Sequence, residues 1–140
     1  MKSLKTLIKL KQREIDIIRR EIGVLQEQKA RHERKIEEHT EELKQEIALA
    51  AQMADMSGFF GNYSEAIKQK RRDLKNQIRK LDIKMDALAE KVREHFSEQK
   101  KYEIALEEQF KREKKKQDMR EQAFLDEVAA RQHMQRQGEI

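Results

Sequence analysis

The chain has 140 residues, of which 42% are charged and 5% aromatic, and it contains no proline, tryptophan or cysteine. This composition argues against a compact globule with a deep catalytic pocket and is typical of long helices or coiled coils. The formal net charge of +5 is small beside 32 basic and 27 acidic residues, and the lack of cysteine excludes a disulfide framework.

The hydropathy of the chain favours a cytosolic protein. The apolar residues between Leu4 and Lys11 are too interrupted by lysine to resemble the core of a signal peptide. No apolar run approaches the roughly 20 residues that a membrane-spanning helix needs. We therefore expect no transmembrane segment.

The first predicted helix covers about 3–56 and carries a coiled-coil seam. Alternating steps of four and three residues lead from Leu4 to Met53 through fifteen positions, ten of them apolar. This is the spacing of a heptad repeat. The five polar positions on the seam are Lys11, Lys29, His32, His39 and Glu46.

A bend is predicted at about 57–62. The stretch from Asp55 to Tyr63 holds two of the four glycines in the chain and three of its seven aromatic residues. Glycine interrupts a helix at little steric cost, and Ser57 and Asn62 are typical of turns and caps. The surrounding sequence favours helix, so this stretch is interpreted as the turn of a hairpin.

The second predicted helix covers about 63–136. Its seam begins with Leu74, Ile78, Leu81, Met85, Leu88 and Val92, after which Phe96 falls one residue late. Such a slip is typical of a local change in supercoil. A basic run without apolar residues follows at 111–116, and apolar residues return at Met119, Phe124, Leu125 and Val128.

Folding the chain antiparallel about 58–61 pairs position i with about 119 − i and brings both seams together along the first helix. The predicted fold is all-α: a long antiparallel two-helix coiled-coil hairpin, formed as one domain by residues 1–140, with a C-terminal helix overhang beyond about 116. The lysines near the N-terminus would then face the basic run 111–116. The overhang keeps an apolar face, and such a helix end usually frays or docks onto a partner.

No motif indicates catalysis, a metal or a cofactor. The residues three positions before the four histidines are Lys29, Ile36, Val92 and Ala130, whereas a di-iron site in a helical bundle needs glutamate there. The glycines at 58 and 61 lack the Gly-Lys-Ser/Thr ending of a phosphate-binding loop. No nucleophile–base pair is evident. We expect a protein that is not an enzyme and needs no cofactor.

Several stretches resemble the FliJ family of flagellar type III export proteins. Leu4-Lys5-Thr6-Leu7 and Arg19-Arg20-Glu21-Ile22-Gly23 are similar to the family's N-terminal helix, and Asn62-Tyr63 is similar to the start of its second helix. The stretch from Leu125 to Arg131 resembles the family's C-terminal hydrophobic-Asp-Glu-x-Ala-x-Arg pattern. In order and spacing, the resemblance covers nearly the whole chain.

The resemblance implies a coiled coil, similar to the stalk of the rotary ATPase gamma subunit, that binds the hexameric export ATPase and promotes assembly of its ring. It also implies links to the cytoplasmic domain of the export gate and to export chaperones, at a cytoplasmic, peripheral position at the flagellar base. The implied ATPase-binding residues are Leu4, Leu7, Lys11, Leu125, Asp126, Glu127, Val128, Ala129 and Arg131. The implied gate-binding residues are Asn62, Tyr63, Ala66, Ile67 and Lys70.

Three alternatives stay open from the sequence. The same pattern fits the equivalent stalk of a virulence type III secretion system. The basic stretches 64–80 and 111–116 are compatible with a helical nucleic-acid-binding protein, although interleaved acidic residues argue against nucleic acid as a partner. Either seam could also form a parallel homodimeric scaffold.

Overall fold

The computed structural model describes residues 3–52 and 57–138, with the backbone alone for 57–60. These residues form two helices, α1 (Leu4–Gln52) and α2 (Ser57–Gly138), and no strand. The all-α prediction is confirmed. At the start of α1 the Ser3 Oγ accepts a hydrogen bond from the Thr6 amide at 3.2 Å, which satisfies one of the amides that a helix leaves unpaired.

The predicted bend is misplaced, because 57–62 lies inside α2. Gly61 is helical, and no glycine in 3–52 or 57–138 has a positive φ. A glycine costs a helix about 1 kcal/mol relative to alanine and does not by itself end it, and the chain has no proline to do so. α1 ends at Gln52 and α2 begins at Ser57, before the predicted bend. The predicted seam position Met53 and the start of the bend stretch lie outside the described residues.

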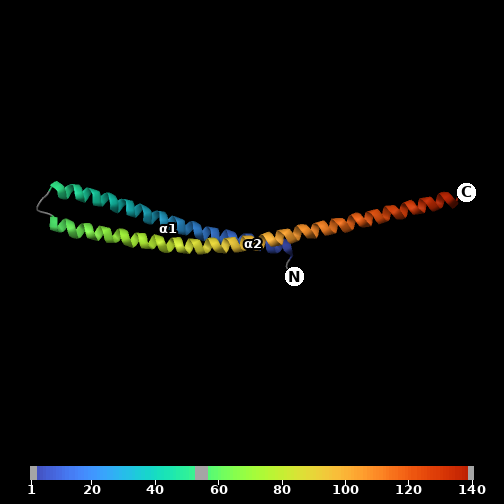
Figure 1. The fold of residues 1–140 in the computed structure, drawn as a ribbon, viewed down its shortest axis with the longest axis horizontal. Coiled ribbons are helices and arrows are strands. Elements are labelled where there is room, and N and C mark those ends of the chain that lie inside the picture. The colour runs from blue at the N-terminus through green and yellow to red at the C-terminus, as the bar shows by residue number, and fades with distance from the viewer. Residues whose placement is uncertain (1–2, 53–56, 139–140) are drawn as a thin grey trace. The chain divides into compact units, whose positions relative to one another are not determined.

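The chain divides into two compact units, each of which contains parts of both helices. Unit 2 covers Arg13–Phe96, and unit 1 combines Met1–Gln12 with Ser97–Ile140. Within unit 2 the two helices lie side by side and antiparallel (Figure 1). Polar contacts cross between them: the His95 Nδ1 lies 3.0 Å from the Glu14 carboxylate, and Lys29 forms an ion pair with Asp82 at 2.8 Å. The antiparallel coiled-coil hairpin is confirmed, so the seams are used within one chain and not in an open parallel dimer.

The pairing register differs from the predicted one. The pairs Glu14–His95, Lys29–Asp82 and Glu42–Tyr63 place position i opposite roughly 110 − i, not 119 − i. A residue of α1 therefore lies opposite a position of α2 about nine residues earlier than predicted. Since moving a reversal point by a few residues shifts the pairing by twice as many, the end of α1 at Gln52 and the start of α2 at Ser57 agree with the direction of this error.

The seam of α1 is confirmed by burial. All predicted seam positions from Leu4 to Ala50 are buried or half-buried, and Ile15 is only 1% exposed. The polar positions are accommodated individually: Lys29 pairs with Asp82, and the His39 Nδ1 lies 3.2 Å from the Glu42 carboxylate. The Nδ1 of half-buried His32 has no hydrogen-bond partner among the described residues.

The seam of α2 does not slip at Phe96. Phe96 is exposed, and the heptad spacing continues from Val92 through His95 and Gln99 to Tyr102 and Leu106, all of them buried or half-buried. His95 and Gln99 are polar seam residues, so a search for apolar residues at heptad spacing did not detect the seam there.

Unit 1 pairs the first turns of α1 with α2. Gln99, which is 6% exposed, donates from its Nε2 to the Ile8 carbonyl at 3.3 Å and to the Gln12 Oε1 at 3.0 Å. Beside this pair, Lys11 bridges to Glu98 at 2.6 Å. The Lys5 ammonium lies 5.5 Å from the centre of the Phe110 ring. These contacts fix the mutual register of the two segments.

The C-terminal overhang begins earlier than predicted. Leu106 is the last half-buried residue of the paired part, and from Glu107 to Gly138 every residue except half-buried Val128 is exposed. We call residues 111–138 the C-terminal segment. The predicted facing of like charges is not seen: Lys11 lies against an acidic residue and Lys5 against an aromatic ring. Within the basic run 111–116, the residue that shares a groove with Lys5 is Glu113, whereas Lys111 and Arg112 pair with glutamates of their own helix.

Candidate partner-binding surfaces

The C-terminal segment exposes large apolar side chains. Phe124 is 64% exposed and Leu125 59%, and Met119 and Met134 are exposed as well. Glu113, near its start, lines a groove with Leu4 and Lys5, and beyond that groove Figure 1 shows the segment, coloured orange to red, continuing without another part of unit 1 beside it. An exposed amphipathic helix of this kind gains little from its own chain and has apolar surface available for a partner.

The predicted ATPase-binding motif divides between faces of this helix. At 3.6 residues per turn, Leu125 and Val128 share one face, with Phe124 at its edge, whereas Ala123 and Ala130 lie on the opposite face. Val128 is half-buried and Ala129 exposed. The apolar face therefore depends on Leu125 and Val128.

The charged residues of the motif bond along their own helix. The Gln122 Nε2 donates to Asp126 at 3.1 Å, and the Arg131 Nη2 lies 2.9 Å from the Glu127 carboxylate. Pairs with this spacing add only a few tenths of a kcal/mol to a helix, so about as little would be lost if a partner rearranged them.

The N-terminal residues of the predicted ATPase set lie elsewhere in unit 1. Leu4, Leu7 and Lys11 are half-buried, and Leu4 lines a groove with Leu106, Phe110 and neighbouring residues as far as Glu113. From Glu113 to Leu125 is about 18 Å along the helix axis. The structure therefore does not bring the two halves of the predicted set together.

The predicted gate-binding residues lie near the start of α2. Asn62, Tyr63, Ala66 and Lys70 are exposed, but Ile67 is 2% exposed and belongs to the seam. Its side chain is not accessible to a partner while the hairpin is closed. Of the five predicted gate-binding residues, the four exposed ones are accessible to a partner.

Tyr63 also ties α2 to α1. Its hydroxyl donates to the Glu42 Oε1, and His39 contacts the other oxygen of that carboxylate. The Tyr63 hydrogen bond, followed by that of His39, lowers the pKa of Glu42, and the same Glu42 bond raises the pKa of Tyr63. The aromatic ring is thereby held in one orientation beside the predicted gate surface.

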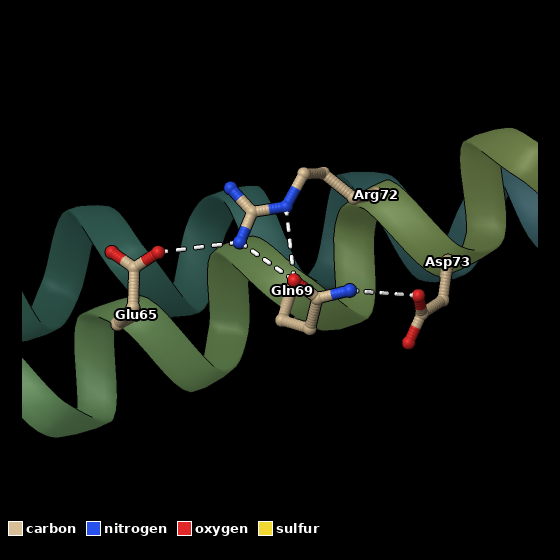
Figure 2. Close-up of polar contacts among 4 residues, drawn as sticks. All are labelled: Glu65, Gln69, Arg72 and Asp73. Atoms are coloured by element: carbon tan, nitrogen blue, oxygen red, sulfur yellow. Dashed lines mark hydrogen bonds and ion pairs between the residues drawn. The ribbon is translucent and has the colours of Figure 1, made fainter.

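A polar network that the sequence reasoning missed covers the adjoining surface of α2. Figure 2 shows Glu65, Gln69, Arg72 and Asp73 in one row along the helix. The Arg72 Nη2 lies 3.2 Å from Glu65 and 2.7 Å from the Gln69 Oε1, and the Gln69 Nε2 donates to Asp73 at 2.9 Å. Their spacings of three, four and seven residues are the signal that could have revealed it.

The described residues show neither a metal centre nor a membrane span. Across 3–52 and 57–138, no group of three or more His, Cys, Asp or Glu side chains is arranged to hold a metal ion. Within the same ranges, neither helix has a stretch long and apolar enough to cross a membrane.

Comparison with known proteins gives one family. The model of the family described as "Flagellar FliJ protein" matches residues 1–138. No curated protein and no solved structure matches the chain. The family match covers both helices, including the paired part of each unit and the C-terminal segment. The chain therefore belongs to the FliJ family, whose members are components of the flagellar export apparatus.

Proposed function

We propose that this protein is a non-enzymatic coiled-coil stalk that binds the hexameric export ATPase through its C-terminal segment and promotes assembly of the ATPase ring. The observation that carries the proposal is the apolar face around Leu125 and Val128, which no other part of unit 1 covers. Membership of the FliJ family supports the choice of partner.

The stalk role fits the way in which the apolar residues are distributed. In unit 2 they are used in the seam between α1 and α2, which makes the hairpin self-sufficient. In the C-terminal segment they are spread along one helix and stay exposed. Such a surface can lie against the inner wall of a ring and contact more than one subunit.

The gate-binding part of the proposal concerns the start of α2. The exposed residues Asn62, Tyr63, Ala66 and Lys70 would contact the cytoplasmic domain of the export gate. The Glu42 bond that holds Tyr63, and the network of Figure 2 beside it, support a preformed surface there. The protein would thus link the ATPase to the gate from a cytoplasmic, peripheral position at the flagellar base and would also contact export chaperones.

The test is a double substitution in the apolar face. Leu125→Asp with Val128→Asp places two carboxylates on that face and should abolish binding of the export ATPase in a pull-down. Ala123→Asp with Ala130→Asp adds the same charge to the opposite face and is the matched control, which should still bind. Helicity measured by circular dichroism should be nearly equal in both variants. Equal binding by both variants would contradict the proposal.

A further inference from the structure

A second apolar surface lies on unit 2, separate from both proposed binding sites. Two grooves, of about 480 and 280 Å³, share Glu21 and Leu88 and follow one side of the hairpin. Ile18, Leu25 and Leu88 form the floor, while Val24 and Ile17 on the α1 rim are more than half exposed. We call this surface the mid-hairpin groove.

The two rims of the mid-hairpin groove carry opposite charges. The α1 rim contains Glu14 and Glu21, separated by seven residues and alternating with Ile17 and Val24. The α2 rim contains Lys84, Lys91 and His95, with Ala87 between the lysines. Glu21, Lys84 and Lys91 form no ion pair with any other described residue. Glu14 and His95 contact each other at 3.0 Å, so the charges open to a partner are Glu21 on the α1 rim and Lys84 and Lys91 on the α2 rim, beside the apolar strip.

A surface with one acidic and one basic rim is complementary to itself. A twofold axis parallel to the hairpin turns a second copy so that its α1 rim faces the α2 rim of the first, with residues kept at the same height. In the observed register Glu21 lies at nearly the height of Lys91, and Val24 at that of Ala87. The operation therefore places glutamate against lysine and valine against alanine, twice each.

We propose that the mid-hairpin groove binds a second copy of this chain face to face, so that two hairpins form a four-helix bundle through unit 2. The heptad seams stay closed within each chain, and the new contact uses the flanking positions. The groove begins about 20 Å along α2 from Lys70, so it is a separate stretch from the proposed gate surface. The contact is confined to one stretch of the hairpin, so a dissociation constant of roughly micromolar order is expected.

The experiment is sedimentation equilibrium of the full-length chain with charge-reversal variants. The wild type should rise from 16.8 kDa toward twice that mass as its concentration increases. Glu21→Lys and Lys91→Glu alone should each weaken self-association by about tenfold or more, because each places two like-charged pairs in the interface. An equimolar mixture of the two variants should recover the dimer. In that mixture the new lysine of one variant meets the new glutamate of the other, and the unaltered Glu21 meets the unaltered Lys91.

The control is Glu27→Lys, an exposed α1 position that does not line the groove and should associate like the wild type. A chain that stays at 16.8 kDa up to roughly millimolar concentration would overturn the proposal and assign the groove to a helix of another protein. A dimer that is unaffected by Glu21→Lys, or a mixture that fails to recover, would also overturn it. The pull-down of the ATPase tests the C-terminal segment, so its outcome does not depend on self-association through the mid-hairpin groove.

Discussion

The paired helices of unit 2 and the C-terminal segment of unit 1 have similar sequences but differ in how far their apolar residues are buried. Both are charged helices with apolar residues at helical spacing. In unit 2 those residues meet across the hairpin, and Ile15, Leu43, Ile67 and Leu81 are buried. In the C-terminal segment, Met119, Phe124, Leu125 and Met134 stay exposed. The difference indicates that the hairpin buries apolar residues within the chain, while the segment leaves its apolar surface exposed.

Shortening one apolar side chain should therefore lower the stability most in unit 2. Ile15→Ala removes the most completely buried side chain of the described residues and should lower the free energy of unfolding by about 2–4 kcal/mol. Leu125→Ala in the C-terminal segment should change it by no more than about 0.5 kcal/mol. Urea denaturation followed by circular dichroism measures both. Similar losses at the two positions would remove the distinction between the regions.

A second prediction concerns the paired part of unit 1. Gln99→Ala leaves the Ile8 carbonyl and the Gln12 amide without their buried donor and should cost about 1–2 kcal/mol. Gln99→Leu should keep most of the stability but loosen the register, because polar groups in a seam specify alignment more than affinity.

Spin labels at Lys9 and Lys101, both exposed and both in unit 1, can measure that register. The distance distribution should broaden in the Gln99→Leu variant and stay narrow in the wild type. An unchanged distribution would show that the neighbouring Lys11–Glu98 pair fixes the alignment without Gln99.

The smallest effect is expected near the start of α2, as a dependence on pH. The folded-state pKa of Glu42 lies below its ordinary 4.5, so its bond to Tyr63 stabilises fully above that value and is lost as pH falls through the lowered pKa. The pKa of Tyr63 lies above its ordinary 10.0, so the stabilisation is present below that value and is lost as pH rises through the raised pKa.

Tyr63→Phe should accordingly lower Tm slightly, with a difference from the wild type that is constant between these limits and shrinks outside them. Thermal melts at intervals across the pH range measure it. Glu38→Gln, at an exposed position of α1, is the comparison variant, because it removes a carboxylate that does not act on Glu42 or Tyr63. A difference that does not change with pH would show that the bond is not formed in solution.

The heptad spacing predicted most of the fold, because apolar residues at that period have to be buried in a charged helix. Every predicted α1 seam position from Leu4 to Ala50 is buried or half-buried. The reversal point was wrong because glycines were interpreted as a turn, although a helix tolerates them at modest cost. The α2 seam through His95 and Gln99 was missed because polar residues do not register in an apolar pattern.

The candidate sites were less predictable than the fold. The exposure of Leu125 follows from the sequence once the overhang is recognised. The overhang was predicted to begin too late because the bend was predicted too late. The burial of Ile67 could not be foreseen, because it depends on the pairing register. The opposite charges across the mid-hairpin groove likewise appear only when the register of roughly 110 − i is known.

The proposed division between a self-sufficient hairpin and a docking segment is tested most directly by a pull-down with the cognate export ATPase. Full-length protein is compared with a version that ends at Met119, which keeps the paired parts of both units and removes Leu125 and Val128. We expect that the full-length chain binds, and that the shortened chain does not bind but melts at nearly the same temperature. Equal binding by the two forms, or binding by neither, would contradict this division.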